Sequence, residues 1–582
     1  MVRVRLEAKH VSDICVTLFI GLFTGVVTFY QSKLWLDYHV VYLFRSAIEI
    51  ADGAIPHREI LITHGVMTAW TQALFILIFG KTQGVLYLST WFFLFLLQAS
   101  LYFSFRMWVP RWLAIMGALV LLTTYPGILF TWPNYYAAGC IGVALWLLSQ
   151  YIETKRSILV FLAGILTGIL FFYRQQLGII PFFAIIGILL CWPFGFLNRK
   201  EMLSTASLIG LGALLSSMTV ILILKQMGAW NDFVFQYIED AGNNGGTAAN
   251  STSNITNELF SFFIGMIKGT FRYGGVFEDW TMFTSKTTNY GWSVFTSYSD
   301  FFISFAVICV AITRSLTRTI SGAVPEKGEG FFFLSAWISL FSMVALYPVW
   351  ELFRGVCAFG PGFYLAVIYF FKGIWIESPK SRIVISFFYI LLGIYLSPKF
   401  YRIIGDTGLL MNWVRNEGVS IDEPPGFSGI RITKKLAATI ESFEKAKKQY
   451  MDLYPDDTFL IATDGGNRLY SYFSIGLPRL KKIPGSDKAF GYPSRLAKLI
   501  PKYLAKKDFH NFAVELANAG FNPIAVCDAD ALGLLPNYLP IFKEKIVGEW
   551  PVSPENSMSL GLCVPVERAR RYYSVYGEIN YR

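Results

Sequence analysis

The sequence predicts a polytopic α-helical membrane protein that ends in an extracytoplasmic α/β domain, and three observations predict this class. Hydrophobic residues make up 54% of the 582 residues and charged residues only 15%, whereas about 25% of the residues of a soluble domain are charged. Up to residue 398, long apolar runs are separated by short basic clusters. From residue 399 to residue 582 no run is long enough to span a membrane, and about half of the Lys and Arg residues lie there.

The apolar runs of residues 1–398 predict about eleven transmembrane helices, because about 18 or more apolar residues in a row are needed to cross the hydrocarbon core. The runs lie near residues 12–30, 84–105, 112–130, 135–151, 157–173, 178–197, 203–225, 297–313, 330–348, 355–373 and 382–398. Aromatic residues make up 17% of the chain, which suits belts of aromatic side chains at the two membrane surfaces.

The basic residues between these runs predict the topology. Lys and Arg concentrate in the cytoplasmic loops of membrane proteins. With about eleven helices, strict alternation places all of the basic clusters on the cytoplasmic side. The clusters include Arg3 and Arg5, Arg106 and Arg111, Lys155 and Arg156, Arg199 and Lys200, Arg314, Arg318 and Lys327, and Lys380 and Arg382.

One apolar segment, residues 65–80, is predicted not to cross. It is barely long enough to span, and it contains Gln72. If it crossed, every later loop would change sides and the basic clusters would face outward. We therefore expect a juxtamembrane or re-entrant helix that packs inside the protein.

This topology places several polar segments on the outer face. The first outer loop covers residues 31–83, and a long outer loop covers residues 226–296. The segment after residue 398 lies on the same side. Because polar residues near the membrane edges were not used to assign the sides, their convergence on one face predicts a site there.

The C-terminal segment, residues 399–582, has the composition of a separate domain. Residues 434–450 have helical periodicity, and strands are expected at 458–463 and 523–527. Alternating helices and strands predict a small α/β domain. Cys527 and Cys563 are candidates for a disulfide, which forms outside the cytoplasm.

Two residues of the first outer loop attract attention as chemical groups. Asp37 follows the first apolar run, in the stretch 35–39, and His64 precedes a glycine at the start of the run 65–80. A carboxylate at the membrane surface can take a proton from an acceptor hydroxyl. The alternatives are a solvated loop residue or a helix N-cap for Asp37, and a helix cap for His64.

The arrangement of Asp37 and His64 resembles the GT-C glycosyltransferases, integral membrane enzymes that take sugars from polyprenyl-phosphate donors. In this superfamily the first outer loop carries a catalytic Asp, followed by a helix and a Lys/His-Pro or His-Gly step. The resemblance implies that Asp37 is the catalytic base and that His64 contacts the donor phosphate or sugar. His39 has no matching motif position, and we expect His57 and Glu59 to be solvated.

Arg174 lies at the outer end of the apolar run 157–173. The preceding residues 163–168 include Ala163, Gly164 and Gly168, and they resemble the small-residue helix that in GT-C members leads to a Lys or Arg at this point. The resemblance implies that Arg174 faces the donor phosphate. The alternative is a side chain that extends to the lipid headgroups without a catalytic role.

Glu351 and Arg354 follow a Tyr-Pro step that ends the run 330–348. They are three residues apart, so they can pair on one helix face. The resemblance implies a phosphate clamp by Arg354 that Glu351 orients, although the commoner family form carries Arg or His at neighbouring positions. The alternative is a structural ion pair at the membrane surface.

The long outer loop combines acidic residues with tryptophans, which suits sugar recognition. Its acidic residues have no metal-ligand spacing, so we predict no tight metal site and no cofactor. No basic stripe or RNA-binding motif occurs, so we expect no nucleic-acid partner.

These features predict an inverting glycosyltransferase, similar to the ArnT/PMT-like and Rgt-like enzymes. It would move a sugar from a polyprenyl-phosphate donor to a lipid, glycan or protein acceptor on the extracytoplasmic face, and we expect it in a bacterial inner membrane. Two alternatives stay open: a transporter or flippase of lipid-linked glycans, and an O-antigen polymerase or ligase. A transporter would favour charges at mid-membrane and an inverted repeat, and the sequence shows neither.

Overall fold

The computed structural model describes residues 8–33, 38–60, 62, 65–122, 129, 131–191, 197–239, 305–318, 320–322, 328–343, 360–362, 364–368, 400, 403–405, 407, 408, 410–421, 427–455, 460–462, 524–528, 538–547 and 557–577. The chain divides into two compact units. The first contains residues 1–28, 90–223 and 241–408, and the second contains residues 29–89, 224–240 and 409–582.

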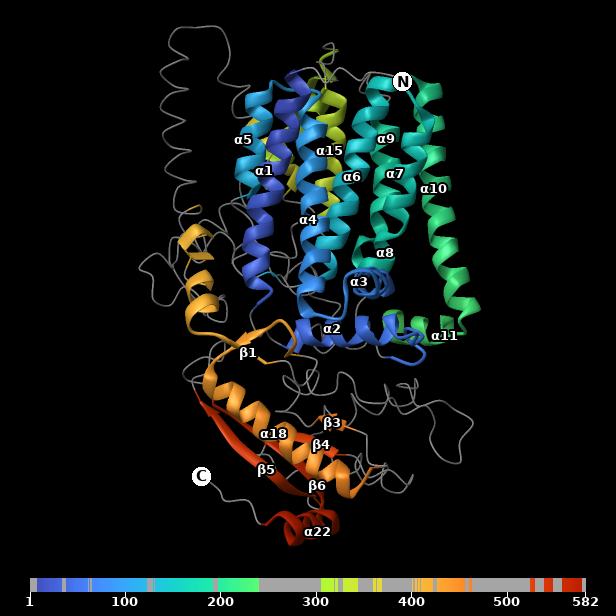
Figure 1. Cartoon of the computed structure of the whole chain (residues 1–582). Helices are drawn as coiled ribbons and strands as arrows, with labels where there is room; N and C mark the ends of the chain where they lie inside the picture. Colours follow the sequence, from blue (N-terminus) through green and yellow to red (C-terminus); the bar gives the residue numbers. More distant parts are fainter. Residues whose placement is uncertain are drawn as a thin grey trace, which may run out of the picture. The chain divides into compact units, whose positions relative to one another are not determined.

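The first unit is a bundle of apolar helices that run side by side (Figure 1). Its described helices are α1 (Ala8–Gln31, which ends in the second unit), α4 (Gln83–Arg106, which begins there), α5 (Arg111–Leu122), α6 (Pro133–Thr154), α7 (Ser157–Gly168), α8 (Leu170–Tyr173), η1 (Gln175–Ile179), α9 (Ile180–Cys191), α10 (Arg199–Gln226, which ends in the second unit) and α15 (Glu329–Ser342). Each lies on a segment that the apolar runs predict.

Four of these helices are long and apolar enough to cross a membrane by themselves: α1 from Val11, α4, α6 and α10. The apolar helices α5, α9 and α15 and the segment Ser157–Tyr173 are shorter. The chain is therefore a mostly helical membrane protein, as the composition predicts. Residues 382–398, the last of the predicted runs, lie outside the described residues.

Glycines let α7 and α10 approach each other closely. A Cβ added to Gly164 would lie 2.5 Å from the backbone oxygen of Ile209, and one added to Gly212 would lie 2.3 Å from that of Phe161. Small residues at such contacts are typical of helix pairs in membranes, where packing drives association. The small-residue run 163–168, which the sequence connects with Arg174, thus packs α7 onto α10.

The second unit contains two short helices of the predicted first outer loop, α2 (Tyr38–Ala51) and α3 (Val66–Phe79). It also contains the beginning of the predicted long outer loop, α11 (Trp230–Phe233) and the π-helix η2 (Val234–Glu239). With 14 residues, α3 is about 21 Å long, shorter than the roughly 30 Å hydrocarbon core. The helices α5, α9 and α15 on predicted spans are equally short or shorter, so the prediction that the segment 65–80 does not cross stays a prediction.

The C-terminal residues of the second unit form a hairpin, two helices and a mixed sheet. The hairpin is β1 (Val419–Ser420) and β2 (Arg431–Ile432), and the helices are α18 (Lys434–Leu453) and α22 (Val566–Tyr576). The sheet has the order β3-β4-β6-β5, with β3 (Leu460–Ala462), β4 (Ile524–Asp528), β5 (Tyr538–Val547) and β6 (Ser557–Pro565). Strands β3 and β4 are parallel, and the other two pairs are antiparallel.

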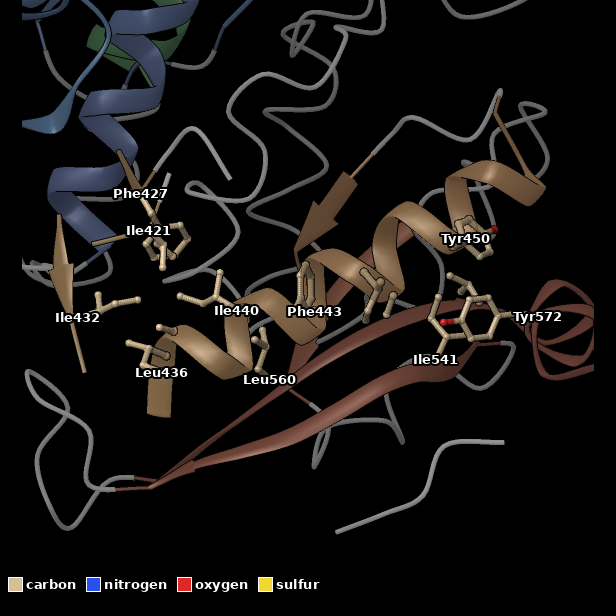
Figure 2. Packing of buried hydrophobic residues seen from close by; sticks show 14 of the residues in the cluster. Ile421, Phe427, Ile432, Leu436, Ile440, Phe443, Tyr450, Ile541, Leu560 and Tyr572 are labelled. Atoms are coloured by element: carbon tan, nitrogen blue, oxygen red, sulfur yellow. The ribbon is translucent and has the colours of Figure 1, made fainter. Parts of the chain in front are cut away.

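Helix α18 packs across this sheet through an apolar face (Figure 2). Thr433 is the N-cap, and its hydroxyl accepts a hydrogen bond from the backbone N–H of Leu436 at 3.2 Å. The shared core joins side chains from the hairpin, α18, the sheet and α22; it includes Phe427, Ile432, Leu436, Ile440, Phe443, Tyr450, Ile541, Leu560 and Tyr572. The helix predicted at 434–450 and the strands predicted near 458–463 and 523–527 are confirmed as α18, β3 and β4.

Cys563 on β6 is disulfide-bonded. Its predicted partner, Cys527, lies on the neighbouring strand β4, where it pairs with Gly561 in the antiparallel register. The register brings the two cysteines onto adjacent strands, two residues apart along the ladder.

Candidate functional site

Arg174 is the predicted site residue that the structure describes, and it lies at a break in the helix. Helix α8 ends at Tyr173, and Arg174 has an extended backbone, with φ −152° and ψ 124°. The 3₁₀-helix η1 begins at the next residue. Because of the break, Arg174 is not part of either helix and lies between two apolar segments.

Two neutral amide side chains hold the Arg174 guanidinium. Its Nη1 donates a hydrogen bond to Oδ1 of Asn134, and its Nε donates to Oε1 of Gln176 at 3.2 Å. Asn134 is in the first turn of α6, directly after Pro133, and is completely buried. The Arg174 residue itself is only 9% exposed. The side chain is therefore fixed in place, and it does not reach freely into solvent.

An aromatic cluster adjoins the arginine. The Tyr173 ring stacks on the ring of Tyr136, with centroids 6.0 Å apart and an angle of 6° between the planes. The Tyr136 hydroxyl lies 3.0 Å from the hydroxyl of Thr90. Phe93 packs against both tyrosine rings, at 5.1 and 6.3 Å. Helices α4, α6 and α8 thus meet beside Arg174 through rings that carry polar groups.

The electrostatics of this arrangement favour an anion. An arginine is protonated at every physiological pH, and the neutral amides of Asn134 and Gln176 orient its guanidinium. Charges that are removed from water are poorly screened, so they interact more strongly than charges at the surface. A guanidinium fork also matches the geometry of carboxylate and phosphate oxygens.

The other predicted site residues, Asp37, His64, Glu351 and Arg354, lie outside the described residues. Their proposed contacts with a donor or acceptor therefore stay predictions.

His57, which we expected to be solvated, is completely buried. Its Nδ1 lies 3.0 Å from Oε1 of Gln236, and the Gln236 amide nitrogen donates to the backbone oxygen of His57 at 2.6 Å. The imidazole also packs edge-on against the ring of Phe233, at 5.0 Å. The expectation was wrong because the groups that bury His57 come from α11 and η2, far along the chain.

Burial lowers the pKa of His57 from 6.5 to about 4, although the hydrogen bond to Gln236 acts in the opposite direction. The imidazole is therefore neutral at pH 7. As a neutral hydrogen-bonding group it joins the segment before α3 to η2. Glu59, also expected to be solvated, is half-buried, and its Oε2 accepts a hydrogen bond from the backbone N–H of Ile55 at 2.9 Å.

Within the described residues, no group of three or more His, Cys, Asp or Glu side chains could hold a metal ion. The described part of the site therefore offers a cation, amides, hydroxyls and aromatic rings.

No protein-family model matches the chain, and no curated protein matches it. Solved structures resemble the chain over most of its length. The oligosaccharyltransferase of Archaeoglobus fulgidus in the apo form is 14% identical with a TM-score of 0.46, and the match covers 97% of this chain and 77% of that one. AglB of the same organism, in complex with an inhibitory peptide and a dolichol-phosphate, gives the same four values. ArnT from Cupriavidus metallidurans in the apo state is 12% identical with a TM-score of 0.48, and the match covers 94% of this chain and 98% of that one.

The resemblance to the GT-C glycosyltransferases stays a prediction from the sequence.

Proposed function

We propose that this protein is an inverting glycosyltransferase that moves a sugar from a polyprenyl-phosphate donor to a lipid, glycan or protein acceptor. One observation carries the proposal: a buried guanidinium, Arg174, is held at a helix break by Asn134 and Gln176. A lipid-linked phosphate brings an anion to the edge of a membrane, and a fixed cation beside apolar helices suits that ligand.

In the proposed reaction Arg174 binds the phosphate of the donor. As the bond between C1 of the sugar and the phosphate oxygen breaks, negative charge develops on the phosphate, and a preorganised cation stabilises that charge. Asp37 takes the proton from the acceptor hydroxyl, whose oxygen attacks C1. A single displacement inverts the configuration at C1. His64, Glu351 and Arg354 are proposed to bind the donor phosphate or sugar.

The proposed division of labour follows the chain. Residues 1–398 form the catalytic module, and residues 399–582 form an extracytoplasmic domain that helps to bind the acceptor or restricts access to the site. The disulfide at Cys563 supports an extracytoplasmic location, because structural disulfides persist in oxidising compartments. The proposed location is a bacterial inner membrane.

The test is sugar transfer in membranes that carry the wild type or the Asp37→Asn variant, supplied with a panel of radiolabelled polyprenyl-phosphate sugars. We expect the wild type to transfer one sugar of the panel and the variant to lose that transfer at an unchanged expression level. Full transfer by the variant would remove Asp37 as the base. Absence of transfer by the wild type from every donor would favour the transporter alternative.

A further inference from the structure

Three basic residues meet where α1 ends, and they come from three different elements. Lys33 lies two residues after α1, Arg415 belongs to the helical residues 410–416, and Arg431 lies on β2. The backbone N–H of Arg431 donates to the backbone oxygen of Lys33 at 2.6 Å. Nη2 of Arg415 donates to the hydroxyl of Tyr30 at 3.1 Å. These bonds fasten the C-terminal chain, with its two arginines, to the end of α1.

The contacts of these cations are neutral groups. Nη1 of Arg431 donates to the backbone oxygen of Gly418 at 3.0 Å, and the Lys33 ammonium lies 5.0 Å from the centre of the Phe29 ring. Among the described residues, no carboxylate forms an ion pair with Lys33, Arg415 or Arg431. The charge of Arg431 is close enough to act on Lys33, and Arg415 bonds to the side chain of Tyr30 in the last turn of α1. None of the three cations has a described counter-charge.

The electrostatic cost of this arrangement is visible in the pKa of Lys33. Its burial and the neighbouring charge of Arg431 lower its pKa. Like charges that are held together repel, and an anion between them relieves the repulsion. The cluster therefore favours a ligand with negative charge.

On the N-terminal side of the three basic residues, the exposed surface of α1 is apolar. Leu22, Val26 and Phe29 are 70%, 45% and 55% exposed. They are spaced four and three residues apart, so they form one stripe of the helix. The Lys33 ammonium lies over the ring of Phe29 at the end of this stripe. The stripe belongs to a candidate membrane span that ends at Gln31. An acyl chain can lie along this stripe while its headgroup meets the cations.

We propose that Lys33, Arg415 and Arg431 form a site for the headgroup phosphate of an anionic membrane phospholipid. The basic cluster binds the phosphate, and the stripe Leu22–Val26–Phe29 receives an acyl chain. A bound lipid of this kind would bridge the end of α1 and the β1–β2 hairpin. The proposal does not depend on glycosyl transfer, because none of the three cations is assigned to the donor site.

The experiment measures binding of short-chain phosphatidylglycerol to the purified full-length protein in a neutral detergent, by native mass spectrometry. The Lys33→Gln/Arg415→Gln variant should bind about 25-fold more weakly, since each Lys or Arg beside an anionic lipid surface contributes about fivefold. The control Lys434→Gln/Lys445→Gln removes the same charge from exposed positions of α18, and it should bind like the wild type. The charge-preserving variant Lys33→Arg/Arg415→Lys should retain binding.

Several outcomes would overturn the proposal. Equal affinity of the wild type and the Lys33→Gln/Arg415→Gln variant would show that the cluster is not the site. Equal binding of phosphatidylcholine and phosphatidylglycerol would remove the role of net charge. Tighter binding of polyprenyl phosphate than of phosphatidylglycerol, lost in the same variant, would assign the cluster to the donor. If the double variant unfolds, the single variant Lys33→Gln provides the test, with an expected loss of about fivefold.

Discussion

Replacement of Arg174 by glutamine tests the proposed phosphate site most directly. The substitution removes the charge but keeps an amide that can bond to Asn134, so the local fold should survive. The structure predicts a large effect on transfer because the Arg174 residue is only 9% exposed and is held by two hydrogen-bond acceptors. Loss of one preorganised group that stabilises developing charge typically costs about 100-fold to 1,000-fold in rate.

We therefore expect Arg174→Gln to lower kcat/KM by at least about 100-fold, which corresponds to about 2.7 kcal/mol of transition-state stabilisation. The kcat/KM of Arg174→Lys should lie between those of the wild type and of Arg174→Gln. Its single ammonium keeps the charge, but it lacks the planar fork that bonds both Asn134 and Gln176. The assay is transfer of radiolabelled sugar from the polyprenyl-phosphate donor that the panel identifies.

The matched control is Arg156→Gln. Arg156 is the residue before α7 and is exposed, so its replacement changes the net charge equally without touching the helix break. It should leave kcat/KM unchanged. If Arg174→Gln keeps a third or more of the wild-type kcat/KM, the arginine is a structural residue and the argument for a phosphate site at the break is wrong.

Three further predictions concern the fold. The pKa of His57 is about 4 in the folded chain, so between pH 6.5 and pH 4 the unfolded chain binds more protons than the folded chain. The free energy of unfolding should therefore fall by roughly 3 kcal/mol as the pH falls through this window. Urea unfolding of the His57→Gln variant should lack that fall. Gly212→Ala should lower the thermal unfolding midpoint in detergent, because its Cβ would meet a backbone oxygen at 2.3 Å, whereas Gly210→Ala, with its nearest contact at 3.6 Å, should not. Peptide mapping without reduction should recover Cys563 linked to Cys527; recovery of unlinked Cys527 would contradict that pairing.

The sequence predicts the helices of the bundle well because each depends on a local property. A run of apolar residues is visible in the sequence whatever it packs against, and α1, α4 and α10 begin and end within a few residues of the predicted runs. The start of α18 also depends on a local contact, because the N-cap Thr433 accepts a hydrogen bond from the residue three positions later. Such elements carry their own signals.

The errors concern contacts between distant parts of the chain. His57 and Gln236 are 179 residues apart, and no spacing in either segment predicts that they meet. A histidine beside Arg58 and Glu59 has the composition of a solvated loop, and only the rings of the α11–η2 segment turn its surroundings apolar. For the same reason the sequence does not predict the packing of the run 163–168. Its glycines are visible in the sequence, but the helix that they contact, α10, is not.

Whether the short helix α3 crosses the membrane determines the predicted side of every later loop. A contact within the second unit bears on this question. Lys81, just after α3, forms an ion pair with Asp52, just after α2. The end of α3 is therefore fastened to the end of a helix that precedes it in the same outer loop. The ion pair supports the prediction that the chain returns to its starting face before α4.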